Sequence, residues 1–153
     1  MTQENIKKQI KLLSDISKEE MLVAPRNIKQ MPSVATLQKI VALIRDIVFP
    51  AYFDDKQGDP IFRSHHIGVN VERLSILLKE QIALALGFEC EDNESLGSRA
   101  EELLEEFIEA LPEIKRLLFT DVKAIFDNDP AVHNYSEVIF CYPVVQTMLH
   151  YRV

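Results

Sequence analysis

The stretch Ser98–Phe126, SRAEELLEEFIEALPEIKRLLFTDVKAIF, decides the fold class of this chain. Its apolar residues recur at intervals of three and four positions, the spacing that places side chains on one face of a helix. Ser98 and Glu101 match a capping box, in which each side chain accepts a hydrogen bond from the other residue's backbone N–H. Pro112 suits the first turn of a helix. We therefore expect one helix to begin at Ser98 and a second to begin at Pro112.

The same apolar spacing continues on the amino-terminal side of this stretch. Ile6, Ile10 and Leu13 predict a first short helix. A second apolar stripe consists of Val34, Leu37, Val41, Ile44 and Val48. It predicts a helix that Pro50 ends, because proline cannot continue the backbone hydrogen bonds of a helix. Residues 64–87 carry apolar side chains on so many sides that we expect them to form a central, buried helix.

Polar segments with turn-forming residues separate these helices. Residues 53–63, FDDKQGDPIFR, and the acidic residues 89–97 are interpreted as loops. Residues 127–130, Asp-Asn-Asp-Pro, have the composition of a turn. Ser136 then suits the cap of a further helix, and Pro143 restarts or kinks that helix.

The composition is that of a globular protein with one domain, residues 1–153. Apolar residues make up 47% of the chain, and no segment shows the alternation with a period of two that a strand requires. The sequence therefore predicts an all-α fold, a compact bundle of six to eight helices. The formal net charge of −7 argues against nucleic-acid binding, because phosphates are bound by clustered Lys and Arg. The apolar runs are too short for a membrane-spanning helix and the first residues too polar for a signal peptide, so we expect a cytoplasmic protein.

Side chains that could carry chemistry are scattered. The sequence has no Gly-rich phosphate loop and no CxxC, HExxH or GxSxG motif. His65 and His66 would lie on different faces of a helix, so no metal site is predicted. The glutamates between residues 101 and 109 are expected on a solvated face opposite the apolar stripe. Cys90 and Cys141 are expected to be free thiols, with Cys141 acting as a buried apolar residue.

Residues 120–153, TDVKAIFDNDPAVHNYSEVIFCYPVVQTMLHYRV, carry a more specific pattern. Its elements are Asp121, Ala124, Asp129-Pro130-Ala131, Tyr135-Ser136, Val138-Ile139, Tyr142-Pro143 and Tyr151-Arg152. In order and spacing, the pattern resembles the end of the helical domain of serine O-acetyltransferases. Residues 49–53, FPAYF, and the helical pattern of residues 74–86 look like the longer bacterial variety of this family. Val144 departs from the family pattern, which usually has Gly there, and the resemblance is weak over the first 45 residues.

The resemblance implies an acyltransferase of cysteine biosynthesis that transfers an acetyl group from acetyl-CoA to the hydroxyl of L-serine. In the family, the catalytic His and Asp and the acetyl-CoA groove lie in a left-handed parallel β-helix of hexapeptide repeats that follows the helical domain. This chain stops about where that domain would begin, without a helix-ending signal. We therefore expect a chain truncated before the β-helix, with no catalytic residue and no bound cofactor. Such a chain would be inactive alone, and acetyl-CoA would be the co-substrate of the parent enzyme.

The resemblance also assigns one residue of the substrate pocket to this chain. Asp129, with Pro130 beside it, would reach the pocket that binds L-serine and the feedback inhibitor cysteine. A carboxylate can pair with the ammonium group of an amino acid, and a proline stiffens the turn that holds it. From the local sequence alone, Asp129 is instead interpreted as a turn or helix-cap residue. Asp121 is expected at the start of a helix rather than at a ligand site.

The resemblance further implies partners. In the family the helical domains join two trimers into a hexamer, and a far carboxyl-terminal tail, absent from this chain, binds O-acetylserine sulfhydrylase. Exposed apolar surface is then expected where other subunits and the β-helix would pack. The alternative interpretation is an autonomous helical interaction module without catalysis, whose acidic helix at residues 101–111 docks a partner. A metal-binding four-helix bundle is not favoured, because no Glu-x-x-His pairs are present.

Overall fold

The computed structural model describes residues 3–15, 17, 20–21, 31–50, 52–53, 60–87 and 93–153. In these ranges the chain forms six helices and no strand, which confirms the predicted all-α bundle for the part that is described. The helices are α1 (Gln3–Ser14), α3 (Val34–Val48), α4 (Pro60–Leu86), α5 (Asn93–Asn128), α6 (Tyr135–Cys141) and α7 (Pro143–Arg152). None of them is both long enough and apolar enough to cross a membrane.

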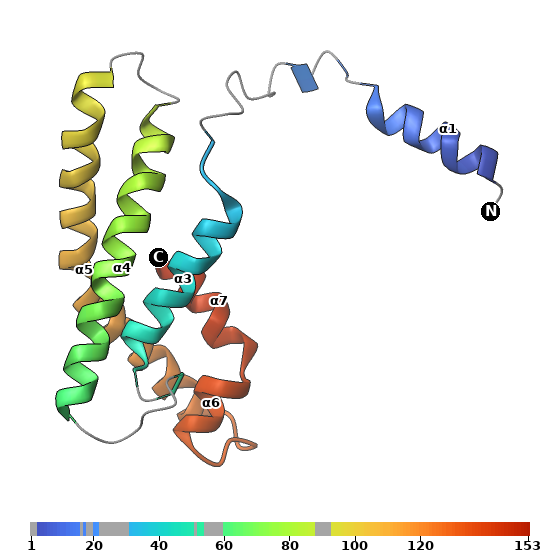
Figure 1. Cartoon of the computed structure of the whole chain (residues 1–153). Coiled ribbons are helices and arrows are strands. Elements are labelled where there is room, and N and C mark those ends of the chain that lie inside the picture. Colours follow the sequence, from blue (N-terminus) through green and yellow to red (C-terminus); the bar gives the residue numbers. More distant parts are fainter. Residues whose placement is uncertain are drawn as a thin grey trace.

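The long helices α4 and α5 run alongside each other, and α3 packs against α4 (Figure 1). The short helices α6 and α7 fold back against α5, and α7 also reaches α3. The predicted first helix, α1, forms as expected, but it is drawn apart from the others and its side chains are exposed (Figure 1). The core therefore lies where α3, α4, α5, α6 and α7 meet. The largest fully buried side chains are those of Phe49, Ile44, Leu74, Leu118, Leu149, Val48, Val122 and Val138.

Helix α3 begins and ends close to the predicted positions, but it presents a different face to the core. Its amino terminus is capped by the Ser33 hydroxyl, and the chain leaves the helix at Phe49, directly before Pro50. The predicted stripe is partly wrong, because Val34 is 70% exposed while Ile40 and Ile47, outside the stripe, are buried. Apolar residues occupy so much of the helix circumference that their spacing alone does not choose the buried face.

Helix α4 is longer and more exposed than the sequence predicts. It begins at Pro60 rather than near Ser64, because proline is tolerated in the first turn of a helix, where its missing N–H has no partner to lose. Helix α4 lies between α3 and α5, as expected of a central helix, but the expectation that it is buried is wrong. Among its described apolar side chains only Leu74 is fully buried, whereas Phe62 and Ile76 are exposed. Because α3 and α5 cover only part of its circumference, most of the remaining apolar side chains are half-buried and a few stay open to solvent.

Helix α5 is a single helix that continues through Pro112. The predicted break at Pro112, the capping box at Ser98 and the loop over residues 93–97 are therefore wrong, and residues 89–92 lie outside the described ranges. A proline inside a helix costs about 3 kcal/mol, whereas burying one large aliphatic side chain contributes about 1.5–3 kcal/mol. Leu111 and Ile114 are both buried in the core on either side of the proline. Packing thus outweighs the lost hydrogen bond.

The corner formed by α6 and α7 follows the prediction at Pro143 and differs from it elsewhere. Pro143 starts α7, but the cap of α6 is Asn134 rather than Ser136, because the Asn134 side chain accepts a hydrogen bond from the Glu137 N–H at 2.9 Å. The free thiol of Cys141 is exposed, so the prediction of a buried cysteine is wrong. It ends α6 on the outward side, while Val138 and Ile139 turn into the core.

Candidate functional site

Asp129 stands one residue past the end of α5, in the turn that leads to α6. Its N–H still donates to the Ile125 carbonyl at 3.0 Å, so the residue keeps the direction of the helix. Its Oδ1 accepts a hydrogen bond from the Ala131 N–H at 2.9 Å across Pro130. This bond is an Asx turn, in which a carboxylate replaces a backbone carbonyl. The bond confirms a turn-stabilising role for Asp129, and it fixes one oxygen of the carboxylate.

The second oxygen of Asp129 is held by a residue of the α6–α7 junction. The Tyr142 hydroxyl donates to Asp129 Oδ2 at 2.8 Å. Tyr142 is the carboxyl-terminal cap residue of α6 and the amino-terminal cap residue of α7, and its side chain is half-buried against the core. The carboxylate is therefore oriented by two donors that come from different parts of the chain.

These two donors also set the protonation of the site. The Ala131 N–H and then the Tyr142 hydroxyl stabilise the ionised form, and they lower the pKa of Asp129 below its ordinary value. The same hydrogen bond raises the pKa of Tyr142, because the phenol that donates to a carboxylate is harder to ionise. Asp129 is thus a carboxylate, and Tyr142 a neutral phenol, at neutral pH.

The neighbouring Asp127 shows what distinguishes Asp129. Asp127 Oδ2 pairs with the Lys123 ammonium at 2.6 Å, so a cation of the same helix already neutralises its charge. In the described ranges, no Lys, Arg or His forms an ion pair with Asp129, whose two partners are neutral donors. The turn therefore offers one carboxylate whose negative charge is oriented but not neutralised, which suits an ammonium group.

Asp121 has a different role from the one expected. It lies inside α5 rather than at a helix start, and both of its oxygens accept hydrogen bonds from Arg152 at 2.6 and 2.7 Å. Each side chain is only 19% exposed. The bonded carboxylate raises the pKa of Arg152. This bidentate pair ties the last turn of α7 to α5 and so fixes how α7 packs against α5.

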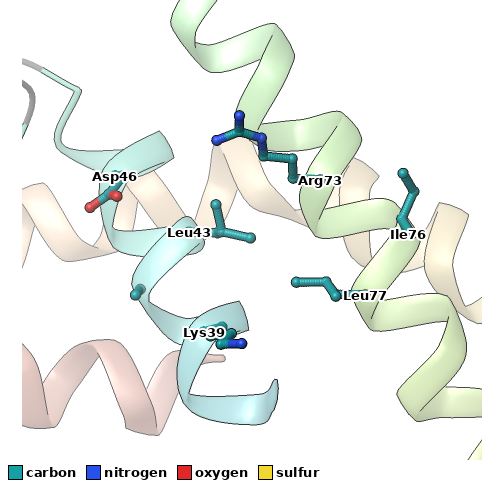
Figure 2. A pocket seen from close by; sticks show the side chains of 7 residues that line it. Lys39, Leu43, Asp46, Arg73, Ile76 and Leu77 are labelled. Atoms are coloured by element: carbon teal, nitrogen blue, oxygen red, sulfur yellow. The ribbon is translucent and has the colours of Figure 1, made fainter. Parts of the chain in front are cut away.

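An open groove of about 420 Å³ lies between α3 and α4. Leu43 of α3 faces Leu77 of α4 across it, Ile76 also lines it, and Lys39 and Arg73 stand at its sides (Figure 2). Ile76 is 64% exposed. An apolar floor with charged sides suits the packing of another protein surface better than it suits a small polar substrate.

The remaining candidates are ordinary surface groups. The five glutamates of residues 101–109 are exposed, as predicted, and Glu101 forms an ion pair with Lys79 of α4. His65 is exposed, and His66 lies 2.8 Å from the amide nitrogen of Asn70, one turn away. Within the described ranges, no three His, Cys, Asp or Glu side chains come together as metal ligands would.

Sequence reasoning singled out Asp129 but missed its partner. A turn and a whole helix separate Tyr142 from Asp129, so no periodicity predicts their contact. The only hint is a phenol in the apolar run Val138–Tyr142, since a buried tyrosine usually finds a partner for its hydroxyl.

The comparisons with known proteins agree on one family. The family profile described as "Serine acetyltransferase, N-terminal" matches residues 59–143. A plasmid-encoded serine acetyltransferase of Synechococcus elongatus is 34% identical over 130 residues, which covers 80% of this chain and 41% of that protein. A serine acetyltransferase of Synechocystis is 49% identical over 35 residues, or 23% of this chain and 14% of that protein. The chain thus spans less than half the length of these relatives.

Proposed function

This chain belongs to the serine acetyltransferase family, and we propose that residues 1–153 form the helical amino-terminal domain of an enzyme that transfers an acetyl group from acetyl-CoA to L-serine. The match of the amino-terminal family profile over residues 59–143 supports this assignment. The relative of Synechococcus elongatus supports it further, because the similarity extends over most of the chain.

The acetyl transfer itself requires groups that we assign to another domain of the parent enzyme. Acylation of a hydroxyl needs a general base that removes its proton and a site that holds the thioester. We propose that a β-helix domain supplies the catalytic His and Asp and the acetyl-CoA groove, and that the helical domain alone is inactive and binds no cofactor. The similarity covers only 41% of the Synechococcus elongatus relative, so more than half of that protein lies outside the matched region, which supports the proposal.

Asp129 is the residue that this domain contributes to the L-serine site. The observation that carries the proposal is the state of its carboxylate, which is held by two neutral donors and is not paired with a cation of the described chain. The ammonium group of L-serine would neutralise it through a charge-assisted hydrogen bond. Pro130 stiffens the turn next to it, so little conformational entropy is lost when the substrate binds.

The test compares two neighbouring aspartates, Asp127 at the end of α5 and Asp129 in the turn that follows, in the protein encoded by the whole gene. Asp129→Asn removes the charge that binds the ammonium group, and we expect the KM for L-serine to rise at least tenfold. The KM for acetyl-CoA should stay unchanged. Asp127→Asn is the matched control, because Asp127 is already paired with Lys123, and it should leave both KM values near those of the unmodified enzyme. An unchanged KM for L-serine in Asp129→Asn would refute the proposed site.

We also propose that the helices assemble copies of the enzyme into a homo-oligomer. The exposed side chains of Ile61, Phe62 and Ile76 on α4 support this role, and so does the open groove beside Ile76. Apolar side chains gathered on one helix are a common mark of a surface that another subunit covers.

A further inference from the structure

The orientation of the Asp129 carboxylate depends on more than its own turn. Rotation of an aspartate about its Cβ–Cγ bond is weakly restricted, because this terminal torsion has broad minima. The Ala131 N–H holds Oδ1 alone. The Tyr142 hydroxyl on Oδ2 supplies the second point that defines the plane of the carboxylate.

Tyr142 is itself a fixed donor. Its N–H donates to the Val138 carbonyl at 3.3 Å, and its carbonyl accepts from the Val145 N–H at 3.1 Å. Pro143 follows directly and restricts the residue before it to extended backbone, which agrees with the observed φ of −87° and ψ of 114°. The ring packs against the core. The phenol therefore reaches Asp129 from a backbone that is held on both sides.

We infer that Tyr142 is a positioning residue for the substrate, which turns the Asp129 carboxylate into the orientation that receives the ammonium group of L-serine. This inference rests on the proposed function of Asp129. Each carboxylate oxygen has two lone pairs, and in the described part of the chain each accepts one hydrogen bond from the protein, Oδ1 from Ala131 and Oδ2 from Tyr142. The remaining lone pair of each oxygen is available to the ligand, and the two protein donors determine where it points.

A purely structural role is the competing explanation, since the same bond ties the α6–α7 junction to the end of α5. The two roles differ in what they change. If the bond between Tyr142 and Asp129 is only structural, its loss lowers the thermal stability. The molecules that remain folded then bind L-serine with normal affinity. Loss of a positioning bond changes the affinity for L-serine and the titration of Asp129 in the folded protein.

The experiment uses the whole gene product with Tyr142→Phe, which removes the hydroxyl and keeps the ring. The matched control is Tyr135→Phe. The Tyr135 ring stacks on the Phe126 ring with the two ring centroids 4.2 Å apart, and the Tyr135 hydroxyl is not bonded to Asp129. We expect Tyr142→Phe to raise the KM for L-serine roughly three- to tenfold. The lost hydrogen bond is made to the charged Asp129 and not to L-serine, so its effect on the substrate is indirect. The KM for acetyl-CoA and the kcat at saturating L-serine should change less than about twofold, which is less than the change expected in the KM for L-serine.

Two further measurements keep the test independent of folding. Carbon-13 NMR of the Asp129 carboxyl should show its pKa rising toward the ordinary value in Tyr142→Phe and staying in place in Tyr135→Phe. Fluorotyrosine at position 142, a stronger donor of the same shape, should move that pKa in the opposite direction. In an Asp129→Asn background, Tyr142→Phe should add no further rise in the KM for L-serine, because the two residues act as one unit.

The outcomes separate the two proposals. If Asp129→Asn leaves the KM for L-serine unchanged, the proposed site is wrong and this inference with it. If Asp129→Asn raises that KM while Tyr142→Phe behaves like Tyr135→Phe in both KM and carboxyl pKa, the site stands. The positioning role of Tyr142 is then overturned.

Discussion

Two regions of this bundle differ in whether their side chains find partners within the chain. In the corner where α5, α6 and α7 meet, polar groups find partners on other elements of the same chain, as in Asp129–Tyr142 and Asp121–Arg152. In the groove between α3 and α4, apolar side chains such as Ile76 remain exposed (Figure 2). In the corner, hydrogen bonds between different elements hold the polar side chains in place, whereas the groove leaves an apolar surface open to solvent.

This difference indicates which geometry is set by the chain alone. A network whose donors and acceptors are satisfied internally keeps its arrangement before any ligand arrives. An exposed apolar groove gains its stabilisation only when another surface removes it from water. This difference fits the two roles that we propose, a preorganised contact with L-serine at the corner and assembly of copies at the groove.

The largest expected effect lies in the hydrophobic core. Leu118 is fully buried, so Leu118→Ala should lower the free energy of unfolding by about 2–5 kcal/mol, the cost of lost burial plus a cavity. Ile76→Ala in the groove should change it by less than about 0.5 kcal/mol. Urea denaturation of the two variants measures both values. Equal losses would mean that the two regions do not differ in packing.

A smaller effect is expected at the Asp121–Arg152 pair. Asp121→Asn removes the charge that both N–H groups of Arg152 contact, so the Tm should fall, though less than in Leu118→Ala. Asp127→Asn breaks an exposed pair one helical turn long and should leave the Tm almost unchanged. Thermal unfolding followed by circular dichroism compares them. A fall in Asp127→Asn as large as in Asp121→Asn would show that the cross-helix pair has no special role.

The smallest effect on stability is expected in the groove itself. Ile76→Ser should keep the free energy of unfolding within about 0.5 kcal/mol of the unmodified chain and should weaken self-association in sedimentation velocity experiments. Val144→Ser replaces an exposed apolar side chain of the corner and serves as the control. If Val144→Ser weakens self-association as much as Ile76→Ser does, the groove is not the assembly surface.

The sequence predicts the helices of this fold well and their limits less well. The spacing of apolar residues identifies α3 and the helical character of the residues in α5, and Pro50 and Pro143 mark helix boundaries correctly. Pro112 misleads, because the cost of a proline is local while the burial of Leu111 and Ile114 depends on what packs against them. The same reason explains α4, whose exposure depends on how much of it its neighbours cover.

The site is predictable only in part, for a similar physical reason. The turn at Asp129 follows from its own residues, since Asn, Asp and Pro favour turns by local interactions. Its contact with Tyr142 joins residues that a complete helix separates, and Asp121 meets Arg152 across an even longer stretch of chain. Such contacts depend on how α6 and α7 fold back on α5, which no short-range pattern encodes.

The uninterrupted course of α5 has a mechanical consequence. At 1.5 Å per residue, its 36 residues extend about 54 Å. One end lies beside α4, where Glu101 meets Lys79, and the other end carries the turn of Asp129. Because the two ends belong to one continuous helix, a tilt of the first turns of α5 would displace the turn of Asp129 at its other end.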